Sequence, residues 1–178
     1  MTLANVGEMA GYSRGLATHH FGNKAALLQS LAQYIGDNFL RLFDDAKFET
    51  TGFASVLHFI RTYLGRSGTQ WTNTRAQLVL MTDGITDDST VGADLSKYNE
   101  SVIAFLSKHF TDGIAQGEIR SDVDTRSAAI CLLGSLRGIM LQVLLKESGI
   151  DLSAVRQHLM SSTIYSYAVE PDKWLVTI

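Results

Sequence analysis

Hydrophobic residues recur at helical spacing along almost the whole chain. The longest stripe follows Asn23, which we expect to cap a helix, and consists of Leu28, Leu31, Ala32, Ile35, Phe39, Leu42 and Phe43. Apolar positions at i, i+3, i+4 and i+7 predict an amphipathic helix. Similar stripes predict helices over residues 53–64, 69–82, 95–117 and from Asp151 onward. Because no stretch alternates with period two, the sequence predicts an all-α fold.

The segment from residue 124 to 147 is apolar on nearly every side of the predicted helix. Such a helix must be covered all round, either as a central core helix or by its own domain on one side and a second copy on the other. Gly134 and Gly138 would permit close helix approach in either case. In the second case this helix and the next form a four-helix bundle across a twofold axis. The predicted dimer-interface residues are Leu133, Leu136, Met140, Leu144, Leu159, Met160, Thr163 and Ile164.

Two short helices separated by a tight turn are predicted at the start of the chain. Leu3, Val6 and Met9 share one face of the first helix, which Gly11 ends, and Ser13 is placed to cap the second, RGLATHHF. A helix, a short glycine-containing turn and a second helix predict a helix-turn-helix. His19 and His20 do not predict a metal site, because adjacent helical residues point about 100° apart and no third ligand is close in sequence.

Composition narrows the class of protein. Because 46% of residues are hydrophobic, the chain can bury a core. The net charge of −3 argues against a protein that binds nucleic acid over most of its surface, but it permits a local binding face. The single cysteine, Cys131, excludes an intrachain disulfide and is expected to be buried and inert. Arg137 and Gln142 interrupt the most apolar stretch, so we expect no membrane span and a cytoplasmic location.

The stretch MAGYSRGLATHHFGNKAALL resembles the DNA-binding signature of the TetR family of bacterial transcriptional regulators. The matching positions are Ala10, Gly11, Ser13, Arg14, Gly15, His20, Phe21, Asn23, Lys24, Ala26, Leu27 and Leu28. The later stretch GEIRSDVDTRSAAICLLGSLRGIMLQ is similar to the penultimate helix of that family, which implies dimerisation. Leu16-Ala17-Thr18 departs from the usual Thr-Leu-Tyr of the recognition helix, so a tyrosine contact to DNA is missing here.

The resemblance implies an organisation and a function. Residues 1–45 would form a helix-turn-helix DNA-binding region with the start of a long connecting helix, and residues 46–178 a ligand-binding and dimerisation domain. Members carry a further basic helix ahead of the segment that opens this sequence, so the DNA-binding head is expected to be incomplete. The function implied is a ligand-responsive repressor that binds a palindromic operator in double-stranded DNA as a homodimer and is released by a small-molecule effector.

The candidate DNA contacts lie on and beside the predicted recognition helix: Ser13, Arg14, Gly15, Thr18, His19, His20 and Lys24. Arg14 lies on the first turn, which enters the major groove in this motif, and could reach a base edge or a phosphate. Lys24, at the start of the next helix, suits the phosphate backbone. Only these two residues bring formal positive charge to the first 35 positions, so the electrostatic footprint is thin.

A small-molecule site is expected among the middle helices, as the resemblance implies. The candidate residues are His58, Phe59, Tyr63, Met81, Phe105 and His109. They are aromatic or sulfur-bearing and include no evident charged anchor, which favours an apolar or amphipathic effector. No cofactor is implied.

An enzyme is not indicated. The sequence has no glycine-rich phosphate loop, no metal-spaced cluster of ligands and no nucleophile elbow. The alternative function is a dimeric small-molecule-binding module whose truncated helix-turn-helix no longer binds DNA. The genomic sequence just upstream of the first codon would distinguish the two.

Overall fold

The computed structural model describes residues 2–44, 51–65, 70–86, 90–145 and 149–176. Within them lie nine α-helices and no strand, apart from an isolated bridge between Ile119 and Ala168. The helices are α1 (Leu3–Met9), α2 (Arg14–Phe21), α3 (Lys24–Asp44), α4 (Phe53–Gly65), α5 (Gln70–Thr86), α6 (Thr90–Ala115), α7 (Thr125–Leu144), α8 (Leu152–Tyr167) and α9 (Pro171–Leu175). The all-α prediction is confirmed. The expected domain boundary at 45/46 lies outside the described residues.

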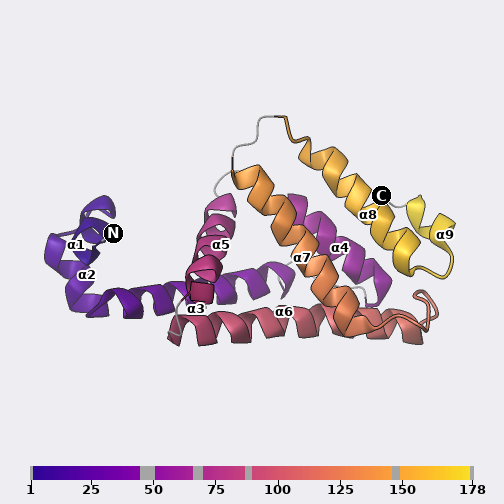
Figure 1. The fold of residues 1–178 in the computed structure, drawn as a ribbon, viewed down its shortest axis with the longest axis horizontal. Coiled ribbons are helices and arrows are strands. Elements are labelled where there is room, and N and C mark those ends of the chain that lie inside the picture. Colours follow the sequence, from indigo (N-terminus) through magenta and orange to yellow (C-terminus); the bar gives the residue numbers. More distant parts are fainter. Residues whose placement is uncertain (1, 45–50, 66–69, 87–89, 146–148, 177–178) are drawn as a thin grey trace.

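The helices form a small head and a larger body (Figure 1). Helices α1 and α2 make the head at one end of the molecule, and α3 leads from it into the body. There α3 packs along α6, the longest helix, which also contacts α4, α5 and α7. Helix α6 therefore contacts both α3, which carries the head, and three helices of the body, α4, α5 and α7.

Helix α4 is the centre of the core. Phe53, Phe59, Ile60 and Tyr63 are each at most 1% exposed, because α4 is covered by α6, α7 and α8 together. Its first turn is held from the α6–α7 connection, where a carboxylate oxygen of Glu118 accepts a hydrogen bond from the backbone N–H of Phe53 at 2.8 Å. The carboxylate accepts a hydrogen bond from a backbone N–H that has no partner within the helix. Its negative charge also interacts favourably with the positive end of the helix dipole.

Helix α7 has one side in the core of this chain and one side at the surface. Its inner side belongs to the core of this chain, whereas Ile130, Leu141 and Leu145 on its outer side are 46%, 45% and 64% exposed. It packs against α4, α5 and α6, which leaves the outer side without cover in the described part of the chain. A helix that is apolar all round therefore shows one covered and one uncovered side.

The predicted dimer-interface residues need correction. Six of them are at most 5% exposed inside this single chain: Leu133, Leu136, Met140, Met160, Thr163 and Ile164. Leu144 and Leu159 are half-buried and pack against the same core. The apolar stripe that the sequence predicts as an interface is the stripe that the body of this chain buries.

The expectation that Cys131 is buried is wrong, because this residue lies on the outer side of α7 and is exposed. Among the described helices, α7 is long and apolar enough by composition to cross a membrane, with a mean hydropathy of 1.7, and 33% of that window is buried in this fold. A single arginine, Arg137, does not bring the average down far enough to exclude such a segment.

Candidate functional site

The head is a compact pair of short helices joined by a tight turn. The turn needs two glycines: Gly11 has φ of +79°, and a Cβ on Gly7 would lie 2.8 Å from the backbone oxygen of Ser13. The backbone N–H of Tyr12 donates to the Gly7 oxygen at 2.9 Å and closes the turn. The predicted helix-turn-helix is therefore present, and its helices approach at a position where a larger residue would collide with backbone.

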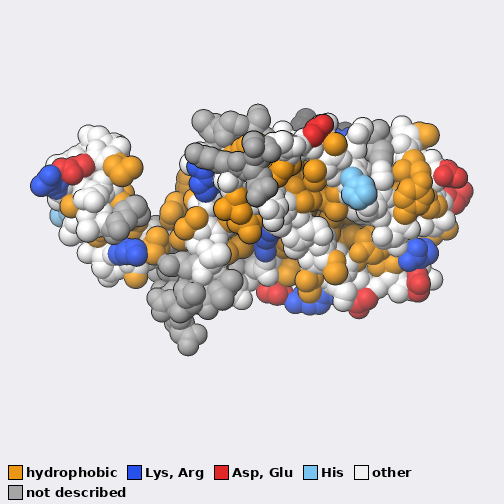
Figure 2. Space-filling model, turned by 45° about the horizontal axis from the view of Figure 1, so that its top comes forward, with side chains coloured by type: hydrophobic (Ala, Val, Ile, Leu, Met, Phe, Trp, Pro, Cys, Tyr) orange, Lys and Arg blue, Asp and Glu red, His pale blue; other side chains and the backbone are white. Residues whose placement is uncertain are grey.

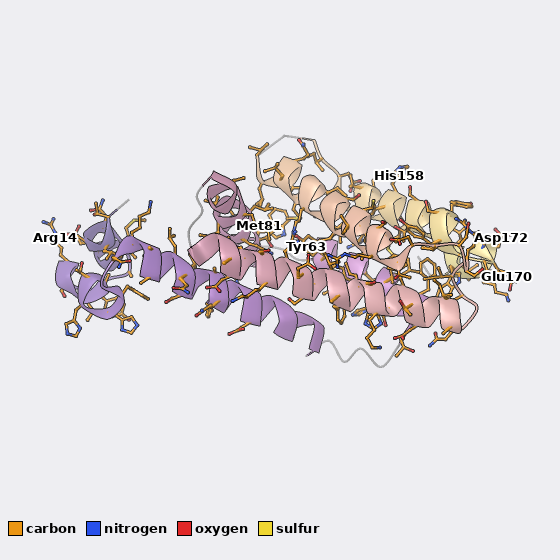
Figure 3. The ribbon with its side chains drawn as sticks, turned by 60° about the horizontal axis from the view of Figure 1, so that its bottom comes forward. Arg14, Tyr63, Met81, His158, Glu170 and Asp172 are labelled. Carbon is orange, nitrogen blue, oxygen red and sulfur yellow. The ribbon has the colours of Figure 1, made fainter. Side chains whose placement is uncertain are left out.

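The predicted DNA-contact residues all lie at the surface of this head. Ala17 turns inward at 8% exposure, while the predicted residues on α2 and its flanks are exposed: Ser13, Arg14, Gly15, Thr18, His19, His20 and Lys24. Figure 3 shows Arg14 at the outer end of the head, and Figure 2 shows the head as a lobe set apart from the body. The geometry therefore leaves α2 free to meet a large flat or grooved partner.

The positive charge that the head can offer to DNA is smaller than the number of its cationic side chains suggests. Arg14 forms an ion pair with Glu8 on α1, and both side chains remain partly exposed. The expectation that the Ser13 hydroxyl caps α2 is wrong, because this N-cap residue makes no side-chain capping bond. The Asn23 cap is confirmed, with its side-chain oxygen accepting from the backbone N–H of Ala26 at 2.9 Å.

An apolar groove runs between the two helices of the head. Its volume is about 340 Å³, and its lining residues are Val6, Gly7, Ala10, Tyr12, Leu16, Ala17, His20 and Phe21. Tyr12 and Leu16 are 63% and 45% exposed along it. Large apolar side chains left in water beside one another mark a surface that packs against another element.

The head is joined to the body along the packing of α3 on α6. Gln29 donates a hydrogen bond to Asp94 at 2.9 Å near the start of both helices. Further along, Gly36 lies against the ring of Tyr98. A movement of α6 therefore acts directly on the helix that carries the head.

Four of the six predicted effector residues form one aromatic series between α4 and α6. The ring centroids of Phe59 lie 6.0 Å from those of both Tyr63 and Phe105, and the Phe105 ring meets His109 edge to face at 4.6 Å. The other two, Met81 on α5 and His58 on α4, are partly buried. Met81 packs against both hydrophobic clusters of the body, and Figure 3 shows it with Tyr63 in the region between α5 and α7.

His109 is the titratable member of this series. It is 6% exposed, and burial lowers the pKa of its imidazole below the ordinary value of 6.5. The neighbouring charge of Lys108 lowers this pKa further, while Asp112 opposes the shift. The ring is therefore held neutral and behaves as an aromatic core residue near neutral pH.

Sequence reasoning missed three polar residues inside the body. Arg137 on α7 donates from Nη1 to the side-chain oxygen of Asn99 on α6 at 2.5 Å. Its Nε and Nη2 are buried and, like the Nε2 of Gln77 on α5, have no hydrogen-bond partner in the part of the chain that the structure describes. The available signal was an arginine in the middle of the most apolar helix, which the sequence pattern marks only as an interruption of a membrane span.

A second missed surface is the exposed stripe of α7 and α8. We define it as Ile130, Gly134, Gly138, Leu141 and Leu145 on α7 with His158, Tyr165 and Val169 on and after α8. The α7 positions follow one another by three or four residues and so share one side of the helix. Tyr165 and Val169 are 61% and 51% exposed, and both helices rest on α4. Hydrophobic side chains are also gathered over the body in the view of Figure 2.

Metal chemistry gains no support from the geometry. Within the described residues, no group of three or more His, Cys, Asp or Glu side chains is placed to hold an ion. His20 instead packs edge to face on Phe21, with ring centroids 4.6 Å apart.

No family model and no curated relative matches this chain. Solved structures do match. A protein from Rhodococcus sp. designated a TetR-family transcriptional regulator is 21% identical, with 91% of this chain and 85% of that chain covered and a TM-score of 0.69. A transcriptional regulator from Saccharomonospora viridis, solved in complex with choline, has a TM-score of 0.82 at 18% identity, covering 94% and 87%. SmeT, the repressor of the Stenotrophomonas maltophilia multidrug efflux pump SmeDEF, has a TM-score of 0.70 at 19% identity, covering 95% and 81%.

These likenesses establish the fold. The chain has the all-helical architecture of TetR-type transcriptional regulators, from the head to the last long helices. All three similar structures are named as regulators and none as an enzyme.

Proposed function

We propose that the chain is a ligand-responsive, DNA-binding transcriptional regulator of the TetR family that acts in the cytoplasm as a homodimer. One observation carries the proposal: a helix-turn-helix whose second helix, α2, is exposed along its polar side at the free end of a regulator fold. A short helix presented this way fits the major groove of DNA.

A homodimer would provide the twofold symmetry that binding to a palindromic operator requires. Apart from His158, the exposed stripe consists of apolar or small residues on α7 and α8, which suits self-association about a twofold axis. Gly134 and Gly138 have nothing within 4 Å of an added Cβ, so a partner helix could approach closely there. The dimer would place two copies of α2 on one side of a roughly palindromic site.

Effector binding would act on DNA through α6. A small molecule seated among α4, α5, α6 and α7 would shift α6, and α3 follows because it packs against α6 through Gly36 and Gln29. The two recognition helices would then move apart or together and lose their match to the half-site spacing. This is the mechanism of a repressor released by its ligand, and differential affinity for the two states is the only way a ligand can drive it.

The direct test is selection of DNA by the protein. Random double-stranded DNA is enriched by successive rounds of binding, using protein expressed from the longest in-frame reading of its gene. A palindromic sequence with half-site centres about one helical turn apart, or a multiple of it, is the expected product. Enrichment of no sequence would contradict the proposal.

One observation favours the alternative function, which is a dimeric small-molecule-binding module that does not bind DNA. The Arg14–Glu8 ion pair neutralises one of the two cations of the head. This alternative predicts ligand binding in a protein that selects no DNA, so the same experiment separates the two.

A further inference from the structure

Arg137 is a half-buried cation in the body, and two of its guanidinium nitrogens are buried. It lies on the α7 turn between Leu136 and Met140, which are 0% and 1% exposed. Its only hydrogen bond to a described residue runs from Nη1 to the neutral side chain of Asn99. The other two nitrogens, Nε and Nη2, are both buried, and neither has a hydrogen-bond partner among the described residues.

The two unpartnered nitrogens form one edge of the guanidinium. Nε and Nη2 point their N–H bonds in nearly parallel directions, which is the fork that binds two oxygens of a single carboxylate side-on. Asn99 occupies the opposite side of the group through Nη1, so it orients the free edge without filling it. The free edge of the guanidinium therefore has the geometry to bind the two oxygens of a carboxylate.

No carboxylate of the described chain neutralises this group. None of the ion pairs between described residues involves Arg137. The acidic residues nearest along α6 are engaged elsewhere: Glu100 pairs with Arg126, and Asp94 with Lys97 and Gln29. An arginine side chain stays charged in proteins, and an unpaired buried charge is costly. A bound anion would remove that cost.

The surroundings of Arg137 suit the rest of an amphipathic molecule. Leu144, seven residues along the same side of α7, is a partly buried apolar side chain, and α5 and α6, which pack against α7, carry the partly buried Leu78, Met81 and Phe105. Helix α5 contacts α7 and also carries Gln77, which is 3% exposed and has an unpartnered amide nitrogen. Helices α5, α6 and α7, which pack on one another, therefore carry partly buried apolar side chains and two sources of unsatisfied N–H donors.

We infer that the effector of this protein is an amphipathic carboxylate whose head group is bound side-on by Nε and Nη2 of Arg137 and whose body lies against the apolar side chains of α5, α6 and α7. The inference rests on the proposed effector site and names the chemistry that it recognises. The same contact links the ligand to the DNA-binding head, because Asn99 adjoins Tyr98, the residue of α6 that packs against α3.

Calorimetric titration in the absence of DNA tests the inference. The probes are decanoate, the neutral analogue decan-1-ol and the cation choline, each with the wild type, Arg137→Met and the control Arg126→Met. Arg126 lies on the same helix but at the surface. We expect wild type and Arg126→Met to bind decanoate at least tenfold more tightly than decan-1-ol and to ignore choline. Arg137→Met should lose decanoate affinity by roughly 30-fold or more, the effect of removing one partner of a buried charge pair.

Two controls keep the result interpretable. Thermal melting without ligand should show Arg137→Met folded and no less stable than wild type, because an apolar side chain replaces an unpaired buried charge. Arg137→Lys keeps the charge but not the fork, and should still bind decanoate far more weakly than wild type. The inference is overturned if wild type does not bind decanoate, if decan-1-ol binds as tightly, or if folded Arg137→Met keeps wild-type affinity. Decanoate binding by a protein that selects no DNA would instead contradict only the proposed function.

Discussion

The backbone of Gly36 on α3 lies directly against the ring of Tyr98 on α6. A Cβ at position 36 would be 3.3 Å from the ring carbon Cδ2, closer than side chains ordinarily pack. Gly36 is buried, and Tyr98 is 9% exposed. The contact joins the helix that carries the head to the helix that carries Asn99, so the absence of a side chain at residue 36 is what lets the two helices meet.

Substitution of Gly36 by alanine should reveal this contact. In an open helical position the change stabilises by up to about 1 kcal/mol, because alanine is the better helix former. Against Tyr98 we expect that gain to be cancelled or reversed, since the ring must move. In a Tyr98→Leu background the gain should return. Urea unfolding of the four proteins measures the coupling, and equal effects of Gly36→Ala in both backgrounds would show that the ring does not constrain α3.

Charge placed on the two sides of α7 should have different consequences. The proposed homodimer predicts a dimeric wild type, and Leu141→Glu puts a charge in the exposed stripe, so we expect that variant to be a folded monomer. Leu136→Glu puts the same charge at a position that is 0% exposed, so we expect an unfolded protein. Sedimentation gives the mass and circular dichroism the helix content. A Leu141→Glu protein that is still dimeric would place the interface elsewhere.

The single cysteine reports on the same surface. Cys131 is exposed in one chain and lies beside Ile130 of the stripe. Reaction with a thiol reagent should therefore be slow in the wild-type dimer and fast in Leu141→Glu. Equal rates in the two proteins, both folded, would mean that a partner does not cover this side of α7.

Acid should destabilise the body through His109. Because burial lowers its pKa below 6.5, the unfolded chain binds a proton more readily than the folded chain. The stability that the neutral ring contributes is fully present above pH 6.5 and is lost as the pH falls from there toward the lowered pKa. We expect the melting temperature of wild type to fall more steeply than that of His109→Gln between pH 7.5 and 5.5. Parallel curves would exclude His109 as a source of the pH dependence.

The helices could be predicted because each depends on local spacing. The apolar stripe after Asn23 predicted the long α3, the Asn23 cap predicted its start, and Gly11 predicted the turn before α2, since caps and turns are set by nearby residues. The exposed side of α2 also followed from the sequence, because a two-helix head has only one way to bury Ala17.

What could not be predicted depends on which element covers which. Spacing alone marks Leu136 and Leu141 as equally apolar positions of one helix, and only the placement of α4 and α6 makes the first core and the second surface. Arg137 was missed for a related reason. A charge in an apolar helix gains meaning only when its neighbours are known, here Asn99 on one edge and no carboxylate on the other.

The central claim, that α2 reads DNA, is tested most directly by a salt titration of binding to the selected palindrome. Wild type, Arg14→Ala and Lys24→Ala are compared by fluorescence anisotropy, each with the palindrome and a scrambled duplex. Arg14→Ala should weaken palindrome binding by about 1–3 kcal/mol and reduce the preference over the scrambled duplex, as loss of a base contact does. Lys24→Ala should weaken both duplexes alike and lower the salt slope by roughly one unit. If both variants bind both duplexes as wild type does at every salt concentration, α2 is not the DNA reader and the account is wrong.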